Sequence, residues 1–347
     1  MSNQSRWLEI LQNSGATLTD NPIDSFTSAN QFERQAEIIA LPSFCLLQIE
    51  GPDARKFLQG QVTCDINALE TTTAQWGAQC NPKGRVIFNF LATSSNDERV
   101  TLRIPSAMAE IARQSLAKYI VFSKAQLSLL EPSPIVGVSG KDAQPIIQQV
   151  FGAPPDKTLS VAVSNAATVI RLGSDRFECW LDEAHMDSTW QQLNALAPVL
   201  PSQHWQLQNI RAGISTVYPQ TSEEFVPQTI NLRQLDAISF TKGCYTGQEV
   251  VARMHYLGKQ KKHTYRATVG TSELPQPGDQ VYVVGEGVTN AGQIVDAAYA
   301  DENTVEILVC LSQAVFDSNS VFLDEQATQP LQFMELPYSL SDDKDTQ

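Results

Sequence analysis

The hydrophobic pattern of this chain changes near Lys262, and the change limits the folds that the chain can adopt. Up to that point, apolar runs of strand length alternate with amphipathic runs of helix length. Beyond it, short runs of alternating polarity are separated by Gly, Pro, Asn and Asp, at residues 264–269, 280–284, 292–297, 305–311 and 320–323. The first pattern is typical of α+β folds and the second of a small antiparallel barrel or sandwich. The sequence therefore predicts an α+β region followed by a C-terminal β domain.

Two groups of strands and helices are predicted within the α+β region. The first has strands at 44–49, 74–80, 85–93, 100–104 and 126–130, a helix that ends near Gly60, and a helix over 106–120. The second has strands at 135–139, 168–172 and 176–181, and helices over 142–151 and 185–196. Because strands and helices are mixed and the hairpins are short, we expect two ferredoxin-like α+β units. One more helix is expected over 204–212.

The composition sets the expected domain boundaries. Residues 4–13 predict a short amphipathic helix, and 14–35 are rich in Ser, Thr, Asn and Asp, so 1–35 are expected to be an N-terminal helix and a loose linker. The α+β region then covers 36–262, with a subdomain boundary near 131–134. A C-terminal β-barrel is expected over 263–340, and the polar, acidic residues 341–347 predict a disordered tail.

Charge is unevenly distributed along the 347 residues, whose formal net charge is −14. So acidic a chain is not expected to be a general nucleic-acid binder, which needs a basic face. Between Arg233 and Arg266, however, seven basic and two acidic residues give a local charge of +5. This segment suits an anionic ligand, an RNA or an acidic partner, although charge runs are often only solvated turns.

The six cysteines are scattered, with no C-x-x-C pair and no short His/Cys cluster. We therefore expect neither a classical zinc site nor a dense disulfide framework. Cys45, Cys179 and Cys310 lie in apolar strand-like runs and are predicted to be core residues. The N-terminus does not resemble a signal peptide, and no apolar run reaches the roughly 18 residues that span a membrane. A soluble, cytoplasmic protein is expected.

Cys244 lies in the most informative short motif, Lys242-Gly243-Cys244-Tyr245-Thr246-Gly247-Gln248-Glu249. Thr246 and Glu249 have the spacing of a capping box, so a helix is expected to start there, with Thr246 as its N-cap and Cys244 just ahead. The unpaired N–H groups of a helix start and the charge of Lys242 would both favour a thiolate. The alternative is a small core cysteine chosen for packing.

The motifs along residues 35–340 resemble those of the YgfZ family, folate-binding proteins related to the glycine-cleavage T-protein. The resemblance rests on the Cys244 motif, which extends through Val251-Ala252-Arg253, and on several further stretches. They are Phe57–Thr63 with Asp65, Asn81–Arg85, Lys118-Tyr119 with Phe122–Lys124, Phe225–Gln228, Asn231-Leu232 and Leu336–Leu340.

This resemblance implies two intertwined α+β domains and a C-terminal β-barrel around a central channel that binds tetrahydrofolate or a one-carbon derivative. It implies a role with iron–sulfur enzymes, including those that modify tRNA, and it makes Cys244 the functional residue, with Lys242 as the other candidate for the chemistry. Supporting positions in the motif are Gly243, Tyr245, Thr246, Gly247, Gln248, Glu249 and Arg253. Positions implied to contact folate are Phe44, Trp205, Gln228 and Asn231.

Three departures from the family pattern bear on function. Phe44 stands where bacterial relatives have a tryptophan that contacts folate, so the indole N–H donor is lost. Arg211 stands where T-protein-like sites carry a glutamate that reads the pterin, and an arginine accepts no hydrogen bond. The residues after Lys83-Gly84 include no carboxylate, whereas the T-protein has an acidic pair there. Without it there is no obvious group to assist aminomethyl transfer.

Three functions therefore remain open. The first is a folate-binding accessory protein for iron–sulfur enzymes that uses Cys244, either to hold a cluster transiently or to react with a one-carbon unit. The second is a folate-dependent aminomethyl transferase, which the missing carboxylates disfavour. The third is a module that contacts tRNA through the basic residues of 259–263, which predicts tRNA binding with a steep salt dependence. We expect a monomer with no DNA or membrane partner.

Overall fold

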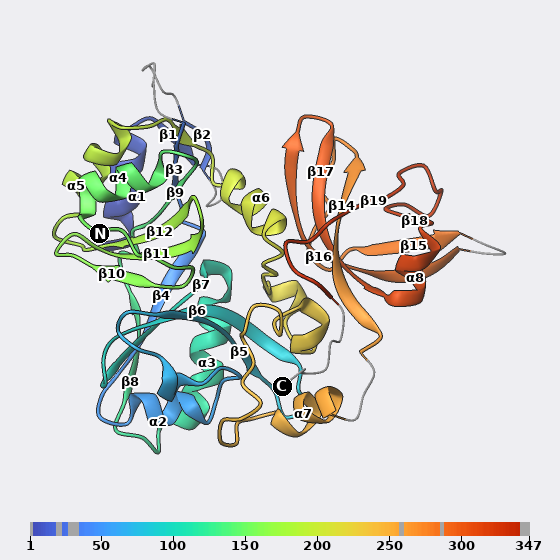
Figure 1. Ribbon diagram of the computed structural model, residues 1–347, viewed down its shortest axis with the longest axis horizontal. Coiled ribbons are helices and arrows are strands. Elements are labelled where there is room, and N and C mark those ends of the chain that lie inside the picture. The colour runs from blue at the N-terminus through green and yellow to red at the C-terminus, as the bar shows by residue number, and fades with distance from the viewer. Residues whose placement is uncertain (1–2, 19–22, 27–34, 257–259, 285–287, 341–347) are drawn as a thin grey trace. The chain divides into compact units, whose positions relative to one another are not determined.

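The computed structural model describes residues 3–18, 23–26, 35–256, 260–284 and 288–340 (Figure 1). The chain forms two compact units, each made of interleaved segments. Unit 1 contains Met1–Phe57, Ile66–Gln75 and Phe90–Trp205. Unit 2 contains Leu58–Asp65, Trp76–Asn89 and Gln206–Gln347.

Unit 1 is built on two mainly antiparallel sheets, and the chain crosses between them so that consecutive strands can belong to different sheets. One sheet has the order β10-β11-β12-β9-β3-β13 and the other the order β5-β6-β7-β4-β8, of which β5 and β6 run on into unit 2. Although β3 and β4 are consecutive, β3 pairs with β9 whereas β4 pairs with β7 and β8. This crossing of the chain between the two sheets confirms the prediction of intertwined α+β units. The strands are β3 Glu37–Ala40, β4 Phe44–Glu50, β5 Ala74–Cys80, β6 Val86–Asn96, β7 Arg99–Pro105, β8 Gln126–Leu130, β9 Ile135–Ser139, β10 Val161–Val163, β11 Ala167–Gly173, β12 Arg176–Leu181 and β13 Val199–Leu200.

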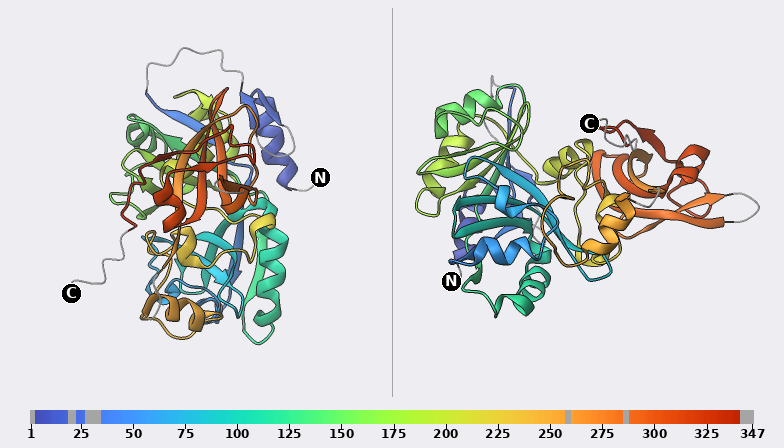
Figure 2. Two further views of the ribbon diagram at one scale, coloured as in Figure 1. Left: turned by 90° about the vertical axis from the view of Figure 1, so that its right-hand side faces the viewer. Right: turned by 60° about the horizontal axis from the view of Figure 1, so that its bottom comes forward.

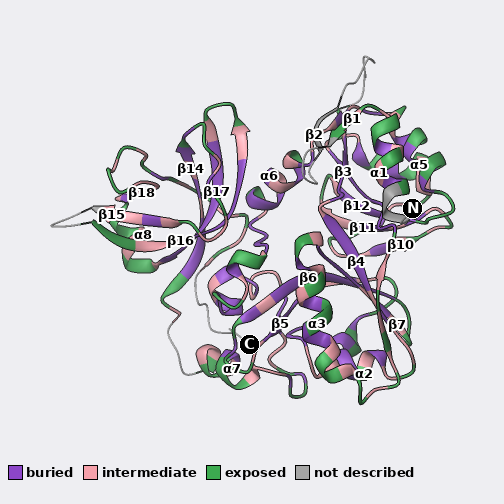
Figure 3. Cartoon of the chain, turned by 180° about the vertical axis from the view of Figure 1, so that it is seen from behind, coloured by how far each residue is buried: buried purple, intermediate pink, exposed green. Residues whose placement is uncertain are grey.

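The helices of unit 1 bury one face and leave the other to solvent, as Figure 3 shows for α5. In α1 the buried residues are Trp7 and Leu11, as the amphipathic pattern predicts. The Trp7 indole meets that of Trp190 edge-on at 5.5 Å, which fastens α1 to α5. The helices are α1 Asn3–Asn13, α2 Ala54–Gln59, α3 Ala109–Ile120, α4 Ala143–Phe151 and α5 Met186–Asn194.

Unit 2 contains a six-stranded antiparallel sheet of order β18-β15-β16-β17-β14-β19. The right-hand view of Figure 2 shows this sheet curling on itself, and its apolar face encloses a core of alternating Val, Ile, Leu and Ala residues. The C-terminal β domain is thereby confirmed. Its elements are β14 Lys262–Gly270, β15 Gln280–Val284, β16 Val288–Asp301, β17 Thr304–Ser312, α8 Gln313–Ser318, β18 Val321–Phe322 and β19 Gln332–Met334. Two further helices are α6 Gln203–Arg211 and α7 Gln248–Tyr256.

The N-terminal segment differs from its prediction. Within 14–35, expected to be a loose linker, β1 Ala16–Leu18 pairs antiparallel with β2 Ile23–Phe26. The Ser14 hydroxyl also accepts a hydrogen bond of 2.9 Å from the Trp190 indole. Polar composition alone therefore did not show that part of this segment pairs and docks. The predicted tail 341–347 lies outside the described residues. In the described part of the chain, no helix is long and apolar enough to cross a membrane.

Asp296 is a buried carboxyl on β16 with neutral partners. It accepts hydrogen bonds from Gln206 Nε2 at 2.7 Å and from the Tyr218 hydroxyl at 3.2 Å. Burial raises the pKa of Asp296 to about 7, and the hydrogen bonds offset only part of the rise. Since an unfolded aspartate titrates near pH 3.9, the folded state holds a proton that the unfolded state releases between about pH 4 and 7.

Stability should therefore fall as pH rises through that window, by on the order of 4 kcal/mol if Asp296 acts alone. Asp296→Asn keeps the shape of the side chain but cannot ionise. The variant should gain stability relative to the wild type as pH rises from about 4 to 7. Urea unfolding of both proteins across this range measures the difference, and identical pH profiles would show that Asp296 is not responsible.

Candidate functional site around Cys244

Helix α7 begins one residue later than the sequence predicted. The first described bond of the helix runs from Val251 N to Gly247 O, so Gly247 is the N-cap and Gln248 the first helical residue. The expected capping box of Thr246 and Glu249 is therefore wrong. Gly247 adopts φ +85°, which is open to glycine and costly for other residues. Cys244 thus lies three residues ahead of the N-cap, farther from the helix start than expected.

Two glycines bring the β5–β6 turn against the start of α7. A Cβ atom added to Gly247 would lie 2.5 Å from Asn81 O and 3.1 Å from Gly84 Cα. A Cβ atom on Gly84, which has φ +70°, would lie 2.8 Å from Val250 Cβ. The turn motif and the Cys244 motif are therefore in backbone contact, and neither glycine has room for a side chain.

On its other side, the Cys244 segment is fastened to residues 58–65. Ser239 N donates to Thr63 O at 2.9 Å, and Thr246 N donates to Gly60 O at 3.3 Å. The Thr63 hydroxyl donates to Ala237 O at 2.6 Å, so one threonine ties the two segments twice. Since these bonds hold backbone groups both before and after Cys244, the path of the loop is fixed on both sides of it.

Lys242 points into unit 2, away from the solvent that Cys244 faces. The Lys242 side chain is buried, and Nζ donates to Val62 O at 2.8 Å and to Cys64 O at 2.7 Å. The cation also lies 5.2 Å from the centre of the Tyr245 ring. Burial lowers the pKa of Lys242 to about 8, an effect that Cys64 and Asp65 oppose. The prediction that Lys242 charges the surroundings of Cys244 is therefore wrong: its ammonium group holds the loop from beneath.

Cys244 is exposed, whereas the other five cysteines, all in described segments, are buried. Burial raises the pKa of the Cys64 thiol to about 12 even though Lys242 opposes the rise, and burial alone raises that of Cys80 to about 12. Thiols with such pKa values stay protonated and unreactive near neutral pH. Among the cysteines, Cys244 is therefore the one placed for chemistry with an external partner.

The rest of the motif divides into framework and surface. Tyr245 is buried, and burial raises the pKa of its hydroxyl, with nearby Cys80 and Cys64 adding to the rise. Glu249 and Arg253 lie exposed on α7. A Cβ atom at Gly243 would meet nothing within 4 Å, so this glycine is not required by packing in the way that Gly247 is.

Phe44 and Trp205, both expected at folate, lie in unit 1 beneath arginines. Arg103 lies over the Phe44 ring at 4.2 Å, and Arg176 lies over the Trp205 ring at 3.9 Å. Glu178 belongs to the same cluster of side chains, because its carboxylate forms a 3.0 Å ion pair with Arg103 Nε.

These groups are almost wholly buried. Trp205 is 1% exposed, and its indole Nε1 has no hydrogen-bond partner among the described residues. Burial lowers the pKa of Arg176 to about 9, although Glu178 opposes the change. Glu178 Oε2 is likewise unpartnered within the described part of the chain. A buried donor and a buried acceptor therefore lie in one charged cluster.

Gln228 and Asn231, the other two residues implied at folate, fasten neighbouring segments of unit 2. Gln228 Nε2 donates to Val251 O of α7 at 2.7 Å. Asn231 binds the main chain of Thr264 twice: its Nδ2 donates to Thr264 O at 2.7 Å, and its Oδ1 accepts from Thr264 N at 3.2 Å. These contacts connect α7 and β14 to the same short segment without any ligand.

Arg211, one departure from the T-protein pattern, and Asn89, which belongs to the stretch after Lys83-Gly84, have structural partners. Arg211 donates twice to Glu306 Oε1, at 2.9 and 2.7 Å, while Arg266 binds the other oxygen. Asn89 donates to Ser215 O at 2.7 Å and accepts from Val217 N at 2.9 Å. Both amide atoms of Asn89 are thus occupied by backbone groups of the same segment, 215–217.

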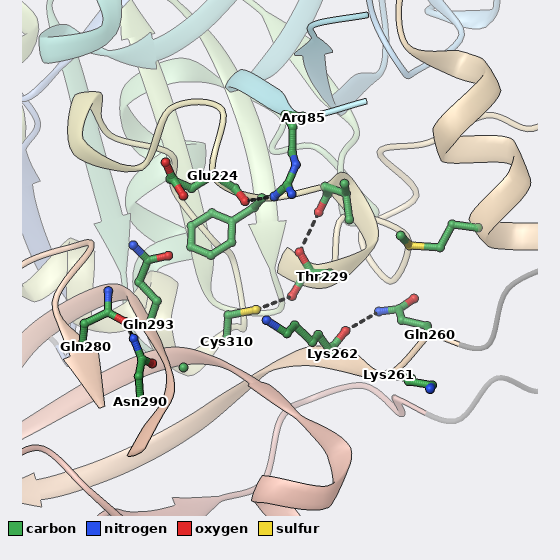
Figure 4. A pocket seen from close by; sticks show the side chains of 14 residues that line it. Arg85, Glu224, Thr229, Gln260, Lys261, Lys262, Gln280, Asn290, Gln293 and Cys310 are labelled. Carbon is green, nitrogen blue, oxygen red and sulfur yellow. Dashed lines mark hydrogen bonds between the residues drawn. The ribbon is translucent and has the colours of Figure 1, made fainter. Parts of the chain in front are cut away.

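The sequence prediction also missed a pocket of about 590 Å³ in unit 2 (Figure 4). Cys310, predicted to be a core residue, lines it, as do Arg85, Lys261 and Lys262. Of the basic segment 259–263, Lys259 lies outside the described residues, and His263 is buried beside Gln260 rather than exposed. No group of three or more His, Cys, Asp or Glu side chains in the described segments could hold a metal ion.

Known proteins resemble this chain over most of its length. The tRNA-modifying protein YgfZ of Serratia proteamaculans is 32% identical over 314 residues, which cover 88% of this chain and 94% of that protein. That of Photobacterium profundum is 33% identical over 313 residues, covering 88% and 92%. No protein-family model matches.

The solved structure of glycine cleavage system aminomethyltransferase T from Bartonella henselae superposes with a TM-score of 0.66. The superposition covers 95% of this chain and 89% of the aminomethyltransferase chain at 15% sequence identity, so the likeness shows the fold alone. The predicted T-protein-like α+β fold is thereby confirmed. The identity to the curated relatives, which extends over nearly their whole length, shows that this chain belongs to the YgfZ family.

Proposed function

We propose that this chain binds tetrahydrofolate or a one-carbon derivative and, through Cys244, supports the iron–sulfur enzymes that modify tRNA. The observation that carries the proposal is the exposure of Cys244 on a turn whose two sides are fixed by backbone contacts. A thiol that serves only packing would be buried, as the other five are. Support for the tRNA role comes from relatives whose name is tRNA-modifying protein YgfZ.

A thiol in this place has two kinds of chemistry open to it. Its thiolate is a natural ligand for an iron–sulfur cluster in transit, which would be cargo rather than a resident cofactor. It is also a nucleophile for an electrophilic carbon. In both cases Gly247 and Lys242 keep the loop in place, and the exposed position of Cys244 lets a large partner approach. The remaining ligands of such a cluster would come from the partner.

The unpartnered polar atoms of the buried cluster in unit 1 support the folate part of the proposal. A pterin presents both N–H donors and ring acceptors, which match the unpartnered Glu178 Oε2 and Trp205 Nε1. Arg103 and Arg176, which lie over the Phe44 and Trp205 rings, give this cluster positive charge. A bound folate would supply a one-carbon unit, and these residues would bind and orient it.

Tetrahydrofolate should quench the tryptophan fluorescence of the wild-type protein in a saturable way. Trp205→Phe removes the indole N–H and should weaken binding roughly tenfold, the value of one hydrogen bond made at a buried site. Trp7→Phe is the matched control, because it also removes a buried indole with an unpartnered N–H, in the α1 core, and should bind normally. Absence of quenching in the wild type would refute the folate assignment.

The role in tRNA modification is tested in cells. Deleting the gene for this chain should lower those tRNA nucleosides whose synthesis requires iron–sulfur enzymes, while other modified nucleosides persist. Nucleoside analysis of bulk tRNA measures both classes in one sample. Unchanged levels of the first class after deletion would refute the role.

A further inference from the structure

The pocket of about 590 Å³ in unit 2 shares elements with the turn that carries Cys244. It is lined by β14, β16, β17 and the segments around Arg85 and Met254. Its volume is within the range of roughly 300–1,000 Å³ typical of ligand sites. Arg85 directly follows Gly84, which packs on α7, and Met254 belongs to α7 itself. The same elements therefore shape the Cys244 turn and one wall of the pocket.

Positively charged, carboxamide and apolar side chains line this pocket. Arg85, Lys261 and Lys262 provide positive charge, whereas Glu224 is the single carboxylate among the described lining residues. Neither lysine has an ion-pair partner in the described part of the chain, so both are available to an anion. Figure 4 shows Lys261 and Lys262 on one side of the pocket and Arg85 above them.

Carboxamides cover the opposite side. Gln280, Asn290 and Gln293 are grouped there, across from the lysines (Figure 4). Asn290 Nδ2 donates to Gln280 Oε1, and the Nε2 atoms of Gln280 and Gln293 donate to Gly278 O at 3.1 and 3.2 Å. The oxygens Asn290 Oδ1 and Gln293 Oε1 are left as acceptors for the donor edge of a base. Phe225 and Met254 add apolar surface to the lining. The cations suit the phosphate of a nucleotide, and the carboxamides suit the edge of its base. The apolar side chains suit the face of the base.

We infer that this pocket binds a nucleotide of single-stranded RNA, with its phosphates on Arg85, Lys261 and Lys262. The choice of RNA rests on the proposed role in tRNA modification. An acidic peptide would also use the cations, and competition with poly-glutamate distinguishes it from a nucleotide. The contact differs from the exposed patch 259–263 expected from sequence, because His263 is buried and Arg85 takes part.

Fluorescence anisotropy with a short labelled single-stranded RNA tests the inference. Three phosphate contacts predict that log K falls with log salt concentration with a slope of about −2, at roughly 0.7 per contact. Lys261→Ala/Lys262→Ala should reduce the slope to about −0.7 and weaken binding by roughly tenfold or more per lysine. Lys141→Ala/Lys157→Ala is the matched control, because these lysines are exposed in unit 1 and the charge change is equal.

A second variant addresses the base. Gln293→Ala should weaken RNA binding with the salt slope unchanged, because it removes a neutral contact. The inference is overturned if the Lys141/Lys157 variant loses as much affinity as the Lys261/Lys262 variant, or if poly-glutamate displaces the RNA as well as unlabelled RNA does. If the wild type does not bind RNA while Cys244 still supports tRNA modification, the pocket assignment fails and the proposed function stands.

Discussion

Replacing Gly247 with alanine should destabilise the protein by at least about 2 kcal/mol, a large effect for the addition of one methyl group. The left-handed backbone at φ +85° is strained for alanine by about 1–2 kcal/mol. The new Cβ would also lie 2.5 Å from Asn81 O, which is backbone and cannot simply rotate away. The β5–β6 turn or the start of α7 must therefore move.

Gly243→Ala is the control within the same motif. Its Cβ would meet nothing within 4 Å, so it should stay within about 0.5 kcal/mol of the wild type. Chemical unfolding of the three proteins measures the difference. A Gly247→Ala protein as stable as Gly243→Ala would show that the contact between the two motifs does not hold the turn.

Regular elements with strong local patterns were predictable from sequence. The strands 74–80, 126–130, 135–139, 176–181 and 280–284 were predicted with the bounds that the structure gives them. The strand β3 was missed, because four residues carry too little periodicity. Its place in the sheet of β9 comes from pairing with a strand nearly a hundred residues away, which local pattern does not reveal.

The site was only partly predictable, since its geometry depends on distant contacts. Cys244 could be selected because its neighbours suit exposure, and the structure exposes it. The direction of Lys242 could not be foreseen, because its partners are the carbonyls of Val62 and Cys64, far away in the sequence. The capping box failed for a similar reason: the N-cap of α7 is Gly247, which contacts Asn81 and Gly84, and not Thr246. Short motifs identify candidate residues, whereas long-range packing decides their roles.

Replacing Cys244 with serine should abolish the proposed function while leaving the fold intact. The Cys244 side chain is exposed and serine is similar in size, so stability should change by less than about 0.5 kcal/mol. Folate binding should also persist, because Cys244 takes no part in the contacts that join Phe44 and Trp205 to their arginines. Serine cannot provide a thiolate ligand or an equally reactive nucleophile near neutral pH.

The most direct measurement of this claim is made in cells that lack the native gene and express the wild type, Cys244→Ser or Gly243→Ala at equal levels. We expect Gly243→Ala to restore the tRNA nucleosides made by iron–sulfur enzymes, whereas Cys244→Ser should leave them at the level of cells without the protein. Full restoration by Cys244→Ser would contradict the claim that the exposed thiol is the functional group.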